Sequence, residues 1–326
     1  QRCARMFGLC CLRALSVQTS LSVHSIALSL SLSKPTLIST NRASFSLLST
    51  SMASEPPLLV LCGKSSEETQ LAISLKENNS LKLPDYAQIL LRLQSEIETS
   101  SETDSFDVHS FLNSLSTTRF GRFLIWSPLL SSTHDIVSHN FGALPMGTVC
   151  VADVQFKGRG RSTNAWESPR GCLMYSFTIQ MEDGRVVPLV QYVASLAITE
   201  AIKDLCTEKG LPKLDVRIKW PNDLYLNGLK VGGILCTSTY KSQKFNISVG
   251  FQPLEELYYQ TWLHSGQRVI VQEKCEDKLV DNVVTIQGLT SSGYLMALGD
   301  DGQMCELHPD GNSFDFFRGL VRHKMT

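Results

Sequence analysis

The sequence predicts an α+β fold, in which a mixed β-sheet is flanked by helices and followed by a small C-terminal β-barrel. Three observations lead to this prediction. Apolar runs typical of strands alternate with helical segments between residues 119 and 262. Residues 188–206 carry apolar side chains at helical spacing. From about Gln267 onward the chain holds only short β runs separated by turn sequences, as in a small barrel.

Residues 1–54 have the composition of a leader. They contain five Lys or Arg residues, thirteen serines and no acidic residue, as organellar transit peptides do. Serines interrupt the apolar stretch Leu21–Leu32, which is shorter than the ~20 apolar residues of a membrane span, so we expect no membrane insertion. A transit peptide, or alternatively a disordered leader or a secretory signal, is predicted here. Its destination would be the chloroplast, the mitochondrion or both, with a cytosolic form if translation starts at Met52.

Residues 55–118 predict a small N-terminal module. The apolar run Leu58–Cys62 favours a short strand, and the polar, serine-rich and glutamate-rich stretch 64–118 favours loose order. Gly63-Lys64-Ser65 follows the strand, but a phosphate-binding loop requires a glycine where Leu58 stands. We therefore reject a phosphate loop at this position.

Residues 119–262 predict the main domain. A helix is expected to begin around Asp135–His139, with Ser132 or Thr133 as its cap, and an amphipathic helix over 188–206. Asn227-Gly228 predicts a hairpin that pairs Leu224–Leu226 with Leu229–Val231. Further strands are expected at 119–126, 148–153, 172–179, 215–219, 234–240 and 245–251.

Residues 263–326 predict the C-terminal barrel domain. Asp300-Asp301-Gly302 and Pro309-Asp310-Gly311 are the turn sequences that separate its strands. The strands are expected at 268–272, 283–288, 294–298 and 304–307.

Charge and cysteine usage exclude some classes of function. Without the leader the chain holds 25 basic and 31 acidic groups, a net charge of −6, which disfavours nucleic-acid binding. The ten cysteines form no C-x-x-C pair, so their spacing disfavours a zinc site and a disulfide framework. We expect buried thiols instead.

Two motifs carry the chemistry. Residues 158–166 read Gly-Arg-Gly-Arg-Ser-Thr-Asn-Ala-Trp, and residues 219–223 read Lys-Trp-Pro-Asn-Asp. Glycines let a loop close over a ligand, and guanidinium groups bind phosphate or carboxylate oxygens through paired donors. The second motif adds a cation, a large ring and two oxygen-bearing side chains. Together the motifs favour a site that binds an acid and a nucleotide phosphate.

With Lys230 and Gly233-Ile234-Leu235, these motifs resemble the biotin protein ligases, and the plant holocarboxylase synthetase branch in particular. The resemblance runs from about Ser131 to the C-terminus. It implies the biotin/lipoate ligase fold, which is class II synthetase-like, with an SH3-like C-terminal barrel. It also implies that biotin and ATP form biotinoyl-AMP, and that biotin then passes to a lysine of a carboxylase's biotin carboxyl carrier domain. The sequence leaves the oligomeric state open.

The resemblance assigns roles to individual residues. Cations would neutralise the charge that builds at the phosphorus, and Mg²⁺ would accompany ATP with oxygen ligands. The implied catalytic residues are Arg159, Arg161 and Lys230. The implied biotin pocket consists of Ser132, Thr133, Gln155, Gly158, Arg159, Gly160, Arg161 and Lys230. The implied ATP and adenylate contacts are Arg161, Trp166, Lys219 and Asn222, with Asp223 placing the metal.

Each assignment has a structural alternative. The glycine-arginine stretch could be a solvated basic loop, and Lys219 and Asp223 could form a surface pair that flanks a turn. Trp166 and Trp220 could be ordinary core aromatics. Ser132-Thr133 could be only a helix cap, and Lys230 an ordinary strand residue.

The sequence departs from the family after Phe251. There the family continues through a segment, roughly fifty residues long, that this chain lacks, including an asparagine that contacts nucleotide or metal. The alternative function is therefore a catalytically deficient splice variant that binds biotin, nucleotide or partner proteins without ligation. Lipoate ligation is disfavoured because Ser162-Thr163-Asn164 does not match the glycine-rich segment of lipoate ligases. No helix-turn-helix is recognisable before Ser131, which disfavours a repressor role.

Overall fold

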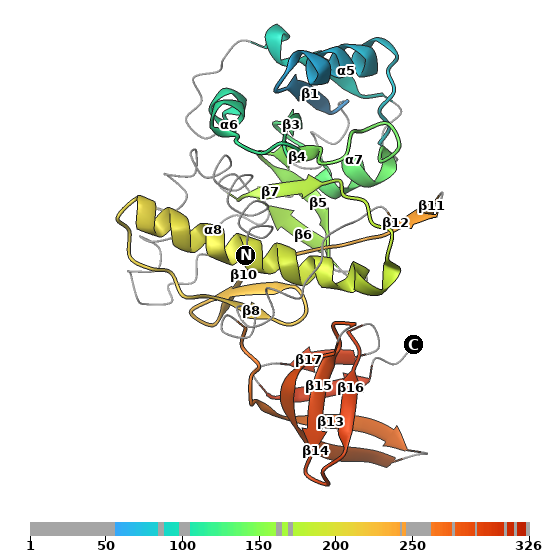
Figure 1. The fold of residues 1–326 in the computed structure, drawn as a ribbon, viewed down its shortest axis with the longest axis vertical. Helices are drawn as coiled ribbons and strands as arrows, with labels where there is room; N and C mark the ends of the chain where they lie inside the picture. Colours follow the sequence, from blue (N-terminus) through green and yellow to red (C-terminus); the bar gives the residue numbers. More distant parts are fainter. Residues whose placement is uncertain are drawn as a thin grey trace. The chain divides into compact units, whose positions relative to one another are not determined.

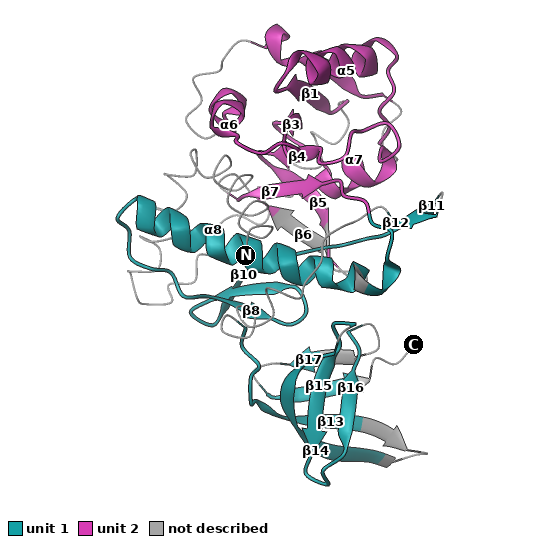
Figure 2. Cartoon of the chain, viewed as in Figure 1, with its two compact units in different colours: residues 1–8, 181–326 teal, residues 9–180 magenta. Residues whose placement is uncertain are grey.

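A computed structural model describes most of the chain from residue 56 onward. The described residues are 56–83, 88–97, 105–160, 165–168, 172–241, 243–245, 262–275, 278–290, 292–309, 312–315 and 318–323. They fall into two compact units, coloured separately in Figure 2. The N-terminal unit comprises the described residues up to Gln180, and the C-terminal unit those from Met181 onward. The predicted transit peptide lies outside the described residues.

The N-terminal unit is built on a five-stranded mixed sheet (Figure 1). β1 pairs in parallel with β2 and antiparallel with β3, while β4 pairs in parallel with β3 and antiparallel with β7. The strands, in sheet order, are β2 (Leu90–Leu93), β1 (Leu58–Gly63), β3 (Phe123–Ser127), β4 (Val149–Ala152) and β7 (Met174–Phe177). This mixed sheet with its helices confirms the predicted α+β class.

One face of this sheet is covered by two helices, α5 (Ser66–Glu77) and α7 (Thr133–His139). The strands contribute alternate residues to the core because successive side chains point to opposite faces of a sheet. Its buried members include Leu59, Leu61, Phe123, Ile125, Cys150 and Ala152 from the strands, with Ala72, Leu75, Ile136 and Val137 from the helices.

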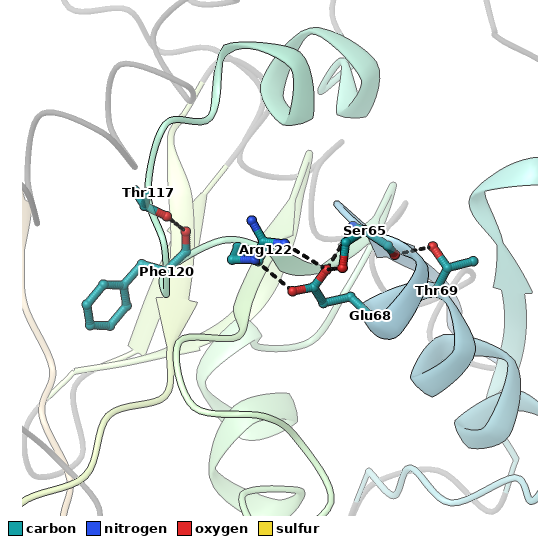
Figure 3. Close-up of polar contacts among 6 residues, drawn as sticks. All are labelled: Ser65, Glu68, Thr69, Thr117, Phe120 and Arg122. Carbon is teal, nitrogen blue, oxygen red and sulfur yellow. Dashed lines mark hydrogen bonds and ion pairs between the residues drawn. The ribbon is translucent and has the colours of Figure 1, made fainter.

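The segment predicted as a loosely ordered module is in fact part of this sheet. It supplies β1, β2 and α5, and also η2 (Gln94–Glu96) and α6 (Val108–Ser114). At the start of α5 the Glu68 carboxylate accepts the Ser65 N–H at 2.8 Å and Arg122 Nε at 2.7 Å (Figure 3). Because Arg122 immediately precedes β3, this contact ties the segment to the main sheet. The predicted boundary at residue 118 therefore does not interrupt the sheet.

The C-terminal unit begins with η3 (Gly184–Leu189) and α8 (Val190–Glu208), which confirm the amphipathic helix predicted over 188–206. A three-stranded sheet follows, in the order β10-β9-β8. The predicted hairpin is confirmed, with φ of 51° at Asn227 and 79° at Gly228, as its tight turn requires. These strands are β8 (Val216–Lys219), β9 (Asp223–Leu226) and β10 (Leu229–Gly233), with β11 (Tyr240–Lys241) and β12 (Lys244–Phe245) beyond.

The strand predicted over 234–240 is wrong except at Tyr240. Ile234 donates its N–H to the Asn222 carbonyl, and its own carbonyl accepts Asn222 Nδ2. Both bonds of Ile234 therefore go to Asn222, in the turn between β8 and β9, and not to a neighbouring strand. The strand predicted over 245–251 lies outside the described residues beyond Phe245.

The chain ends in a six-stranded sheet, in the order β16-β15-β14-β13-β18-β17. It confirms the predicted all-β C-terminal region and its four expected strands, and it adds two strands that the sequence did not predict. Val269, Val271, Ile286 and Leu295 are among its buried residues. The strands are β13 (Arg268–Cys275), β14 (Lys278–Leu289), β15 (Leu295–Gly299), β16 (Met304–Leu307), β17 (Asn312–Asp315) and β18 (Leu320–His323). Within the described part of the chain, every helix is too short or too polar to cross a bilayer.

Candidate functional site

The first motif forms a hairpin in the N-terminal unit. β5 (Gln155–Arg159) pairs with β6 (Ala165–Ser168), and the register places Gly158 opposite Trp166 and Arg159 opposite Ala165. The prediction of a flexible loop is therefore wrong for Gly158 and Arg159, because both residues pair with β6. Gly160 follows directly. Arg161 lies outside the described residues, as do the side chains of Arg159 and Trp166.

A buried polar cluster lies beside this hairpin. Ser132 caps α7, since its hydroxyl accepts the Asp135 N–H at 3.3 Å. Thr133 donates its N–H to Gln155 Oε1 at 2.9 Å, and its hydroxyl lies 2.9 Å from Ser176 Oγ. Ser132, Thr133 and Gln155 are all at most 9% exposed. The structure therefore brings together these three predicted residues, and it adds Ser176 of β7, which no sequence motif marks.

The second motif forms the turn between β8 and β9 in the C-terminal unit. Lys219 and Asp223 face each other across the hairpin, with 4.0 Å between Lys219 Nζ and Asp223 Oδ2. Lys230 of β10 brings its Nζ to 2.8 Å from Asp223 Oδ1. The Lys219 and Asp223 side chains are only 15% and 16% exposed, so they are more than a solvated surface pair. Two ammonium groups thus surround one carboxylate and leave a net positive charge.

Asn222 lies within the same turn and is 7% exposed. Its Nδ2 donates to the Ile234 carbonyl at 2.6 Å. Its Oδ1 is buried without a hydrogen-bond partner among the described residues. A buried carbonyl oxygen left in this state costs free energy, so it is a natural acceptor for a bound group or cation.

Trp220 is a core residue, which agrees with the alternative that it is an ordinary core aromatic. It is 3% exposed, and its indole Nε1 donates to the Tyr192 hydroxyl at 3.1 Å. Its backbone N–H donates to Nε2 of His264 at 3.0 Å. Burial lowers the pKa of His264 to about 4; the hydrogen bond to Gln267 opposes this shift and the charge of Lys219 adds to it. No sequence motif marks His264, because its partner Trp220 lies 44 positions away.

The predicted site residues thus form two groups. Ser132, Thr133, Gln155 and Gly158 belong to the N-terminal unit, and Lys219, Asn222, Asp223 and Lys230 to the C-terminal unit. Among the described residues, no three His, Cys, Asp or Glu side chains gather as they would around a resident metal ion.

Comparison with known proteins places both motifs within one family pattern. The model of the biotin/lipoate A/B protein ligase family matches residues 126–253, and that of the biotin protein ligase C-terminal domain matches residues 264–319. Biotin–protein ligase 1, chloroplastic, of Arabidopsis thaliana is 58% identical over 340 positions, covering 87% of this chain and 93% of that protein. Biotin–protein ligase 2 of the same plant is 59% identical over 321 positions, covering 82% and 98%.

A solved structure, the biotin protein ligase from Aquifex aeolicus in complex with biotin and ATP, is also similar. It is 21% identical and covers 56% of this chain and 94% of that chain, with a TM-score of 0.40.

The alignment lengths also bear on the predicted missing segment. The first Arabidopsis alignment has 340 positions, yet 87% of 326 residues is only about 284, so about 56 positions have no counterpart in this chain. The second alignment has 321 positions against about 267 residues, a difference of about 54. In both alignments the unmatched positions together have about the predicted size of the missing segment.

Proposed function

This chain belongs to the biotin protein ligase family, and from that premise we propose that it forms biotinoyl-AMP from biotin and ATP and transfers biotin to a carrier lysine. The observation that carries this proposal is the 58% identity along 93% of an Arabidopsis biotin–protein ligase. The C-terminal domain match and the names of both relatives favour biotin over lipoate as the acid.

Biotin would bind first in the N-terminal unit. The buried cluster of Ser132, Thr133 and Gln155 offers hydroxyl and amide groups. Such groups suit the ureido ring of biotin, because each polar atom removed from water needs a hydrogen-bond partner. The hairpin with Gly158, Arg159 and Gly160 would cover the acid, and Arg159 and Arg161 would clamp carboxylate and phosphate oxygens.

The phosphates would bind at the C-terminal unit. Attack of the biotin carboxylate on the α-phosphorus brings two anions together, so cations must offset the repulsion. Lys230 and Lys219 supply two such cations, which Asp223 holds on one side of the hairpin. Lys230 would contact the biotin carboxylate or the phosphate, Lys219 the triphosphate, and Trp166 would pack on the adenylate.

The residues also fit a Mg²⁺ ion that arrives with ATP. Mg²⁺ prefers oxygen ligands and is bound by one or two protein groups plus substrate phosphates. Asn222 Oδ1 is a buried oxygen without a partner among the described residues, and the Asp223 carboxylate is its neighbour in the chain. We propose these two side chains as the protein ligands. The ion would neutralise charge on the triphosphate.

The second substrate would be a biotin carboxyl carrier domain of a carboxylase, docked by pairing of β-edges. One Arabidopsis relative is named chloroplastic, which supports the chloroplast as destination. Import into mitochondria, and a cytosolic form that starts at Met52, remain proposals. Fluorescent fusions of the full chain and of the chain from Met52 would distinguish these locations.

The test is a ligation assay with the purified full chain. With biotin, ATP and Mg²⁺, we expect release of pyrophosphate and labelling of a carrier domain on its lysine. Lys230→Gln should suppress both activities. If the wild-type chain yields neither pyrophosphate nor labelled carrier, ligation is excluded.

The absence of about 56 aligned positions favours a second candidate, a variant that binds biotin or nucleotide without ligation. Calorimetry with biotin would then show binding, while pyrophosphate stays at the level of the blank. A reverse-transcribed transcript that spans the codons of Phe251 and Pro253 would establish that the shortened form exists in the cell.

A further inference from the structure

Trp220, the second residue of the Lys219–Asp223 turn, is held by groups that come from outside the turn. Its backbone N–H donates to His264 Nε2 at 3.0 Å. Its indole Nε1 donates to the Tyr192 hydroxyl at 3.1 Å and to the Gly293 carbonyl at 3.4 Å. The main chain and the side chain of Trp220 are thus held by separate groups, and Lys219 directly precedes Trp220 in the chain.

His264 is itself held in one orientation. It is 0% exposed, and its Nδ1 lies 2.8 Å from Gln267 Oε1, which can only accept. Nδ1 therefore carries the proton and Nε2 is the acceptor for Trp220. The centre of the imidazole lies 5.4 Å from the ring centre of Trp262 and 4.9 Å from that of Phe314. A rigid acceptor of this kind can define where the Trp220 amide lies.

Gly293 forms the second anchor. It lies in the turn between β14 and β15 at φ +80°, and its carbonyl also accepts the Tyr192 hydroxyl. A Cβ at this position would come within 2.6 Å of Tyr192 Cε2 and 2.9 Å of Leu189 Cδ2. The close approach to α8 therefore requires glycine for steric as well as conformational reasons.

We propose that the C-terminal β-domain, residues 264–323, positions the Lys219–Asp223 turn for ATP through His264 and Gly293, with His264 as a positioning residue. Both anchors belong to this domain, and a third contact places Lys219 Nζ 5.9 Å from the Phe314 ring. The inference rests on the proposed function, in which Lys219 contacts the triphosphate and Asn222 is a ligand of the Mg²⁺ that arrives with ATP. In this proposal the C-terminal β-domain helps to position residues that bind ATP.

The first test acts on the Gly293 anchor and uses a matched pair of glycines. Gly302 has nearly the same backbone, φ +79°, but open space around its Cβ position. Gly293→Ala and Gly302→Ala therefore carry similar backbone strain, and only Gly293→Ala pushes against Tyr192. Amide hydrogen exchange of the peptide 216–226 should accelerate about three- to tenfold in Gly293→Ala and stay unchanged in Gly302→Ala. Equal exchange in the two variants would overturn the proposal.

The second test acts on His264. His264→Phe keeps a ring but removes the acceptor, whereas His264→Gln keeps an acceptor of similar reach. In pyrophosphate-release assays normalised to folded protein, His264→Phe should raise the KM for ATP about three- to tenfold with little change in the KM for biotin. His264→Gln should recover most of this loss. A purely structural role would lower the folded fraction and leave the KM for ATP unchanged, which would refute the positioning role.

The two tests separate this proposal from the proposed function. If the wild-type chain releases no pyrophosphate and binds no ATP, the ligase proposal fails. Exchange in the peptide 216–226 then decides the positioning proposal alone, because it needs no turnover. Wild-type exchange in both Gly293→Ala and His264→Phe would refute it.

Discussion

Asp223 interacts with two lysine side chains at once, at 2.8 Å to Lys230 and 4.0 Å to Lys219. A carboxylate between two ammonium groups fixes them in place, and the cluster still carries a net charge of +1. This explains how an acidic residue can favour the binding of an anion. Asp223 contributes by holding the two ammonium groups of Lys219 and Lys230 near each other.

Asp223→Asn should therefore impair adenylation. The amide cannot hold both lysines, and it is a poorer ligand for Mg²⁺, so we expect kcat/KM for ATP to fall at least about tenfold. Pyrophosphate release at varied ATP concentration measures this. Asp183→Asn is the control, because Asp183 pairs with Arg185 on the exposed surface. Equal activity of the two variants would contradict both roles of Asp223.

His264 should make stability depend on pH. Burial lowers its pKa to about 4, against an ordinary value of 6.5. Between these values the unfolded chain binds a proton that the folded chain does not. The free energy of unfolding should therefore decrease as the pH falls from 6.5 toward 4, by at most about 3 kcal/mol. Urea unfolding at pH 7, 5.5 and 4.5 measures the slope, and an equal slope in His264→Gln would show that another group causes it.

At the scale of elements, local signals were predictable and pairings were not. Asn227-Gly228 predicted its hairpin, and Ser132 its helix cap, because both depend on neighbouring residues alone. Arg159 and Trp166, in contrast, belong to strands that sequence reasoning treated as loop, since a ladder depends on a partner strand. The short, polar strands β17 and β18 were missed for the same reason.

The candidate site follows the same division. The resemblance assigned Thr133 and Gln155 to the biotin pocket, Lys230 to catalysis and Asp223 to the metal. The structure brings Thr133 into contact with Gln155, and Lys230 into contact with Asp223. The resemblance could not identify His264, because its proposed role depends on its hydrogen bond with the distant Trp220.

The start of α5 offers a test of how α5 is attached to the main sheet. Glu68→Ala removes the acceptor of both the Ser65 N–H and Arg122, so we expect a loss of about 1–2 kcal/mol in the free energy of unfolding. Glu67→Ala, in the same first turn but exposed, should change little. Urea denaturation followed by circular dichroism compares them. Equal midpoints would mean that the Glu68 network is not stabilising.

At the scale of the whole molecule, this chain departs from the two Arabidopsis relatives by about 56 and about 54 alignment positions that it does not match. The match to the ligase family model ends at residue 253, and the match to the C-terminal domain model begins at residue 264. The two matched regions therefore follow each other closely in the chain. The predicted catalytic domain 119–262 includes residues of both compact units. The predicted boundary at residue 262 remains a prediction.

The edge strand of the three-stranded sheet exposes apolar side chains. Leu229 and Val231 on β10 are 64% and 54% exposed, and β10 is an edge strand among the described residues. Substituting both by Thr should lower the fluorescence of a bound hydrophobic dye and reduce aggregation, with little change in the melting temperature. Light scattering and dye titration measure this. Unchanged dye binding would place the exposed surface elsewhere.

The shared sheet of the N-terminal unit restricts how this protein can be shortened for expression. A chain that begins at residue 119 would keep β3, β4 and β7 but would strip β3 of its partner β1 and remove the α5 residues that cover its buried face. Such a fragment would present an open apolar edge along its first strand, the situation that drives misassembly. A soluble fragment must therefore start ahead of Leu58.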